Sequence, residues 1–235
     1  MSRRQMQVAG LLGVVAGACF IAAFVLDPTP PVAGARGADV LSHGVAFSGA
    51  DRAAAFLFAA SGALLIAFLS GLRELLRSAS PGPSWVGTAM LAGGIEVGTL
   101  LASTSVLFFT VASRTDVEGV AQARLLSDLS NYGFVFVGFG VMLMVVAAIP
   151  LMIRARGALR VLGELGIVVA LLLIPYLVTA FFTSGAFVAG GVVTIIGFSA
   201  AGAWVGLTSL ALLLLEPRAL YGGASGASFV SATHD

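Results

Sequence analysis

Charged residues are scarce in this chain, and their scarcity excludes an ordinary soluble globule. Only 10% of the 235 residues are charged, whereas 59% are hydrophobic and the mean hydropathy is +1.05. A soluble domain carries roughly 25% charged residues. The formal net charge is +1, and the sequence has no basic stripe that could follow a phosphate backbone. We therefore expect a protein of the lipid bilayer with no nucleic-acid partner.

Lysine is absent and cysteine and histidine are rare, which removes several kinds of site. All 12 basic residues are arginine, so a retinal or pyridoxal Schiff base cannot form. Cys19 is the one cysteine, which excludes a disulfide within the chain and a cysteine-rich metal site. His43 and His234 lie outside the long apolar runs, which argues against an intramembrane haem. Asp39 and His43 could share a helix face, but two ligands do not make a metal site, so we predict no cofactor and no metal.

Six apolar runs predict the fold. Each is long enough, at about 20 residues, to cross the hydrocarbon core, and backbone groups in lipid must be satisfied within the segment. We therefore predict an all-α polytopic membrane bundle, with one domain over 1–215 and a disordered cytoplasmic tail over 216–235 that is rich in glycine, alanine and serine. The expected spans are 8–26, 53–72, 85–112, 132–153, 165–183 and 192–215. The first run continues past Cys19, which favours an uncleaved span over a lipidated signal peptide.

The arginines lie mainly on one side of the expected membrane. The positive-inside rule places that side, with both termini, in the cytoplasm. We expect the protein to lie in the plasma membrane. The arginine-rich side carries Arg3, Arg4, Arg73, Arg77, Arg154, Arg156, Arg160 and Arg218. The other side carries Arg36, Arg52, Arg114 and Arg124, together with six acidic residues.

Two segments on the outer side have recognisable patterns. Residues 27–50 begin Asp-Pro-Thr-Pro-Pro, a stiff extended start, and we interpret this segment as a solvated loop that contains His43. Residues 114–131 predict a short amphipathic helix on the membrane surface. Thr115 and Glu118 form a capping-box pattern before its apolar stripe.

Glu96 is the one charged residue inside any of the six runs. A charged side chain near the middle of a bilayer is expensive, so such a residue is a functional candidate by default. Helical spacing puts Thr99 and Ser103 on the same face, and we expect this small, polar face to point into the bundle. The candidate intramembrane polar site is therefore Glu96, Thr99 and Ser103. Its carboxyl could bind a proton, a cation or a polar ligand, or it could hold helices in register through hydrogen bonds.

Proline and glycine mark further positions in the runs. Pro150 and Pro175 fall inside the fourth and fifth runs, where proline kinks a membrane helix and frees a carbonyl. Pro175 and Tyr176, near the middle of the fifth run, are a candidate hinge, with a static kink as the simpler alternative. GxxxG patterns at 13–17 and 94–98 permit close helix approach.

Four segments flank the apolar runs: the proline-rich stretch 27–31, Gly-Leu-Arg-Glu-Leu-Leu-Arg at 71–77, residues 123–132, and the basic turn 154–160 followed by Leu-Gly-Glu-Leu-Gly at 162–166. With these segments the layout resembles uncharacterised multi-pass membrane proteins common in actinobacteria, including those grouped under a domain of unknown function. The resemblance covers most of the chain and implies a bundle of six or seven spans. It carries no known activity, so no functional residue is transferred from it.

Catalytic motifs are absent from the sequence. It contains no HExxH, no GxSxG, no Walker loop and no dinucleotide fingerprint, and general acid–base work would depend on Glu96 alone. We therefore expect no enzyme, and an enzyme acting on lipid ranks last. The favoured function is a non-catalytic accessory or scaffold subunit that binds another membrane protein or a second copy. The alternative is a small-molecule or proton-linked carrier or receptor with Glu96 in an intramembrane cavity.

Overall fold

The computed structural model describes residues 2–26, 30–79, 83–114, 119–155, 157–182 and 184–216. The long elements in these ranges are six helices, each long and apolar enough to cross a membrane, which confirms the predicted helical multi-pass protein. They are α1 (Arg3–Leu26), α2 (Gly37–Ala79), α3 (Ser84–Ser113), α4 (Val120–Arg154), α5 (Ala158–Val178) and α6 (Val192–Leu214), with short 3-10 helices η1 (Thr179–Phe181) and η2 (Gly185–Phe187) between α5 and α6. The predicted capping residues Thr115 and Glu118 and the tail from 217 onward lie outside the described residues.

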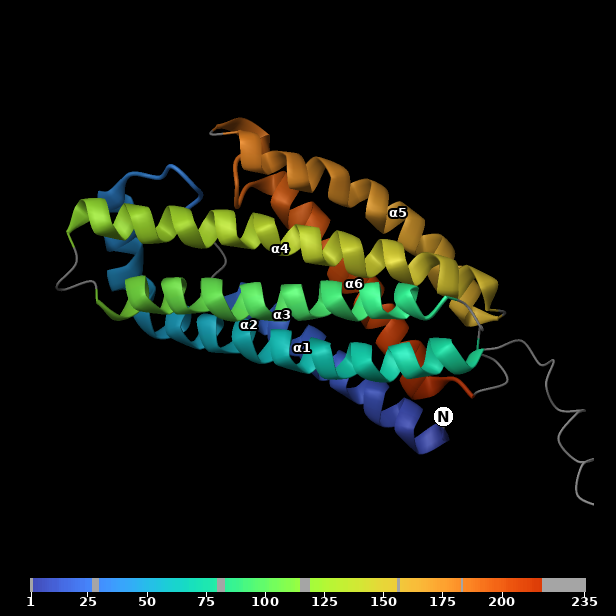
Figure 1. The fold of residues 1–235 in the computed structure, drawn as a ribbon. Coiled ribbons are helices and arrows are strands. Elements are labelled where there is room, and N and C mark those ends of the chain that lie inside the picture. Colours follow the sequence, from blue (N-terminus) through green and yellow to red (C-terminus); the bar gives the residue numbers. More distant parts are fainter. Residues whose placement is uncertain are drawn as a thin grey trace, which may run out of the picture.

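Helix α2 is much longer than the predicted second span. Its 43 residues extend over about 65 Å at 1.5 Å per residue, roughly twice the hydrocarbon thickness. Residues 37–50, which we predicted as a loop, form its first turns, so that prediction is wrong. Val40 packs there against Val111 and Ala123, and such packing supplies most helical stability in proteins. Figure 1 shows these turns crossing the end of the bundle before α2 runs beside α3.

Helix α4 also begins earlier than predicted. Residues 120–131 are its first turns and not a separate surface helix, so the predicted surface helix is wrong. The Gly119 N–H donates to Gln122 Oε1 at 3.3 Å where the helix starts. The buried residues of these turns are Ala123, Ser127 and Ser130, whose small side chains pack inside the bundle. The burial of this small-residue face explains why the segment continues the span.

The six helices form a closed ring. Each packs against the next along the chain, and α6 packs against α1 to close the ring (Figure 1). Helix α2 also contacts α4 across the interior. We call the end that carries Pro30 and Pro31 the proline end, and the opposite end, where α1, α3 and α5 begin, the arginine end.

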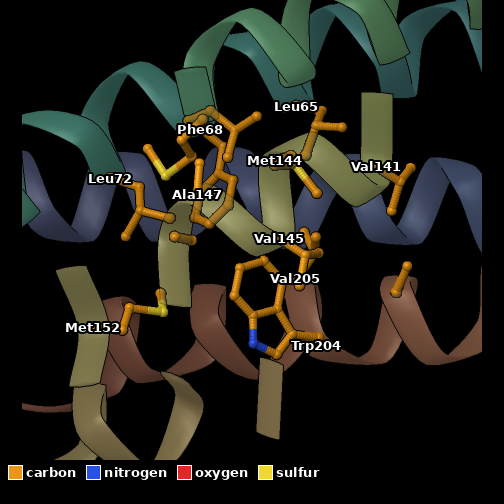
Figure 2. Packing of buried hydrophobic residues seen from close by; sticks show 14 of the residues in the cluster. Leu65, Phe68, Leu72, Val141, Met144, Val145, Ala147, Met152, Trp204 and Val205 are labelled. Carbon is orange, nitrogen blue, oxygen red and sulfur yellow. The ribbon is translucent and has the colours of Figure 1, made fainter. Parts of the chain in front are cut away.

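The main cluster of buried hydrophobic side chains extends along the ring interior. Trp204 of α6 is 1% exposed and is among the largest fully buried side chains. Figure 2 shows its indole among side chains of α2, α4 and α6. Its Nε1–H donates to the Leu162 carbonyl oxygen at 2.8 Å, so the one polar atom of the ring is satisfied.

Glycines bring α3 unusually close to two neighbours. A Cβ added at Gly93 would lie 2.6 Å from the Gly140 oxygen of α4. On another face of α3, Gly98 faces Gly62 of α2, where an added Cβ at Gly62 would lie 3.0 Å from the Gly98 Cα. Small residues at these crossings let the backbones touch, as the GxxxG pattern predicted for 94–98.

A candidate ligand cavity at the proline end

Glu96 lies midway along α3, but its polar neighbours point away from the bundle interior. The Glu96 side chain is half-buried, and Thr99 and Ser103 are exposed. The expectation of an inward polar face is therefore wrong. Helix α3 packs on α4 through the face of Gly93 and on α2 through the face of Gly98. The remaining face, which carries Thr99 and Ser103, is exposed.

The polar groups near Glu96 do not form a connected site. Ser103 donates its hydroxyl to the Thr99 carbonyl of its own helix at 2.9 Å. Glu96 accepts no hydrogen bond from any residue that the structure describes. The hydroxyl of Tyr176 donates to the Phe134 carbonyl. Any role of Glu96 itself stays a prediction.

A cavity lies at the proline end, between α1, α2, α3, α4 and α6. Its volume is about 240 Å³, whereas an apolar cavity of about 150 Å³ in an engineered protein holds benzene. A ring with a short side chain therefore fits. The aromatic lining residues are Phe24, Phe58, Phe108, Phe134 and Phe198, and the polar ones are His43, Asp51, Ser127, Ser130, Asn131 and Thr194.

Asp51 supplies a buried carboxyl to this cavity. Its side chain is 2% exposed, and it is the one charged residue among the buried residues that the structure describes. His43 Nε2 lies 3.7 Å from Asp51 Oδ1, and the imidazole also stacks on Phe47 with ring centroids 4.7 Å apart. The predicted solvated His43 is thus wrong: its side chain is only 12% exposed, whereas Asp39 is exposed.

The segment after α1 is fixed over the cavity by two side chains of α4. Asn131 Nδ2 donates to the Pro31 carbonyl at 2.9 Å. Asp128 Oδ1 accepts from the Gly34 N–H at 2.7 Å. Because Pro30 and Pro31 line the cavity, these bonds set the position of one wall.

A second, adjoining wall is set where the chain enters α6. The Ala33 N–H donates to the Ala189 carbonyl at 3.1 Å, which joins the two walls. Gly190 has a φ of 82°, a conformation that favours glycine, and its N–H donates to Thr194 Oγ1 at 3.2 Å. A Cβ at Gly190 would lie 2.5 Å from Asn131 Oδ1, so the turn needs glycine for space as well.

Four phenylalanines separate the cavity from the middle of the bundle. Phe20, Phe58, Phe134 and Phe198 come from α1, α2, α4 and α6 and contact one another in a closed circuit. Their ring centroids are 5.5, 5.2, 6.2 and 5.7 Å apart around the circuit, within the range of favourable aromatic pairs. We call these four rings the aromatic layer.

Tyr176 supports the aromatic layer from α5. The side chain is fully buried, its ring lies 5.1 Å from Phe198, and its hydroxyl bonds to the Phe134 carbonyl. Pro175 lies three residues before the end of α5 at Val178, rather than at mid-helix as predicted. The hinge stays a prediction, and the contacts of Tyr176 show an anchored side chain.

The sequence reasoning missed Asp51 and His43 because it placed them outside the second span. A signal was available, since Val40, Gly44, Asp51 and Phe58 recur at helical spacings of four and seven. All four are buried or line the cavity. Extending the periodicity backwards from the apolar run would have placed Asp51 on the buried face of the helix.

Comparisons with known proteins gave no match to the chain among protein-family models, curated proteins or solved structures. The cavity and the six apolar helices therefore carry the functional inference.

Proposed function

We propose that this protein is a membrane-embedded carrier or receptor that binds a small molecule in the cavity at the proline end. The supporting observation is a cavity of about 240 Å³ with aromatic walls and one buried carboxyl, inside a close-packed apolar bundle. Small-molecule sites are concave and mostly apolar, with a few placed polar groups. The site differs from the one expected at Glu96, which is not among the lining residues.

The lining favours a ligand with an apolar body and one cationic or hydrogen-bond-donating group. The Asp51 carboxylate is an acceptor, and the faces of the surrounding phenylalanine rings attract cations. A cationic group beside the Asp51 carboxylate would form a charge-assisted hydrogen bond, which is stronger than a neutral one. His43, on the same helix, holds the carboxylate from one side. A small aromatic or branched amine fits this description.

Orientation follows from the arginines. The positive-inside rule puts the arginine end, with both termini, in the cytoplasm, so the cavity faces the outside of the plasma membrane. The test starts from a Cys19→Ala background and adds Asp39→Cys at the proline end or Glu74→Cys at the arginine end, both exposed positions. On intact cells a membrane-impermeant maleimide should label only the first variant. Labelling of the second alone would reverse the orientation.

The functional test is purification in mild detergent, followed by mass spectrometry of what co-elutes. We expect a small amine or hydrogen-bond donor to be released from the wild type and from Asp39→Asn, and much less from Asp51→Asn. Asp39 is a matched control because it lies on the same helix but is exposed and does not line the cavity. A stoichiometric partner protein with no released small molecule would contradict the carrier or receptor function.

An accessory subunit is the second candidate, and one observation favours it. Gly202 and Gly206 lie one turn apart on α6, and nothing lies within 4 Å of a Cβ built at either. An open pair of glycines lets another membrane helix approach closely. A partner protein in the same co-elution experiment would support this function.

A further inference from the structure

A second, smaller pocket is lined by α1, α2, α3, α4 and α6 on the other side of the aromatic layer. Its volume is about 60 Å³, and its walls are mainly apolar. Figure 2 shows Leu65, Met144 and Val205, which reach it from α2, α4 and α6. The one hydroxyl in its lining, that of Ser61, donates to the Ala16 carbonyl at 2.9 Å. The pocket therefore suits hydrocarbon and offers little to a polar group.

The two pockets follow one another along the same helix faces. On α6, Thr194 lines the large cavity, Phe198 lines both, and Gly202 lines the small pocket, each one turn after the last. On α1 the same order runs from Phe24 to Phe20, four residues apart. Rings of the aromatic layer line both spaces along these faces, and a chain that spans the two spaces requires Phe20 or Phe198 to rotate.

Glycines open the small pocket toward lipid at mid-helix. Gly17 of α1 and Gly202 of α6 both line it and both are partly exposed. Nothing lies within 4 Å of a Cβ built at either position. Both lie far from the helix ends, so the opening faces the hydrocarbon interior of the bilayer.

We propose that the small pocket holds the alkyl chain of the protein's ligand, a single-chain amphiphilic amine whose chain end reaches the opening between Gly17 and Gly202. Its ammonium group lies at Asp51 in the large cavity, and its chain passes the aromatic layer. From Thr194 to Gly202 the helix rises by about 12 Å, a length that a medium alkyl chain spans. This inference depends on the proposed function, because the head group uses the same cavity.

The experiment uses full-length protein in phosphatidylcholine vesicles with a fatty amine that carries a diazirine in mid-chain. After irradiation, cross-linked residues are mapped by peptide mass spectrometry. We expect labels on pocket residues such as Leu65 and Val205 in the wild type, and at least a tenfold loss in Gly202→Leu, whose new side chain fills the opening. Gly206→Leu is the matched control: it is equally open and on the same helix, but it lines neither pocket.

Three results would overturn the inference. Labels spread evenly over lipid-facing residues would show bilayer solvation only. Equal labelling of the pocket by a phosphatidylcholine with a diazirine in its chain would show a structural lipid. Equal loss in Gly202→Leu and Gly206→Leu would indicate a partner helix on this face of α6.

Binding of 2-phenylethylamine, which has no long chain, separates this inference from the proposed function. The binding should persist in Gly202→Leu. Absence of binding to the wild type would reject the proposed function itself.

Discussion

Asn131 joins two parts of the chain around the cavity. Its Nδ2 donates to the Pro31 carbonyl at 2.9 Å and to the Ser127 carbonyl of its own helix at 3.0 Å. Removing a side chain that satisfies buried polar groups costs about 1–3 kcal/mol. We therefore expect Asn131→Ala to lower the thermal midpoint in detergent and to speed hydrogen exchange in residues 30–36.

The control for this change is Ser103→Ala. Ser103 is exposed, and its hydroxyl bonds only within its own helix, so the loss should stay within about 0.5 kcal/mol. Equal stability of Asn131→Ala and Ser103→Ala would contradict the role of Asn131 as the tie between α4 and the Pro31 segment.

Two carboxyls, Glu96 and Asp51, show what a single sequence can predict at the residue scale. Glu96 was easy to find because it interrupts an apolar run, but which face of α3 points inward depends on contacts with α2 and α4. Asp51 lies just before an apolar run, and a charged residue at that position predicts the solvated end of a membrane span. Its burial depends on the bundle around it, since lining residues come from five helices. The sequence singles out Glu96, whereas the candidate site at Asp51 follows only from how the helices pack.

At the scale of elements, α3 is held by backbone contact. A methyl group at Gly93 would meet the Gly140 oxygen and the Met144 nitrogen, each at 2.6 Å, and backbone atoms cannot rotate away. Gly93→Ala should therefore cost about 1–3 kcal/mol, as overpacking does, measured as the thermal midpoint in detergent. Gly206→Ala, which has open space around it, should show no loss. A neutral Gly93→Ala would contradict the close α3–α4 crossing.

The helices were predictable in number and less so in length. Apolar runs of about 20 residues mark the spans because lipid excludes unsatisfied backbone. The first turns of α2 and α4 carry too many polar residues for that signal. They are helical because Val40 of α2 and Ala123 of α4 belong to one buried cluster at the proline end. A contact between such distant segments is not visible in local hydropathy.

At the scale of the whole molecule, ring closure creates the site. Helix α1 packs between α2 and α6, and the cavity is lined by residues of these three helices together with α3 and α4. Six spans and an arginine-rich end could be expected from the sequence, whereas the order of helices around the ring could not. The cavity, its aromatic layer and the buried carboxyl all depend on that order.

Equilibrium binding of 2-phenylethylamine to purified protein tests the central claim most directly, with 3-phenylpropionate as an anion of similar size. We predict saturable binding of one amine per wild-type chain, no binding of the anion, and unchanged affinity in Asp39→Asn. Asp51→Asn should weaken binding at least about tenfold, which corresponds to about 1.4 kcal/mol. Absence of saturable amine binding to the wild type, or equal affinity in Asp51→Asn and Asp39→Asn, would contradict a ligand site built around Asp51.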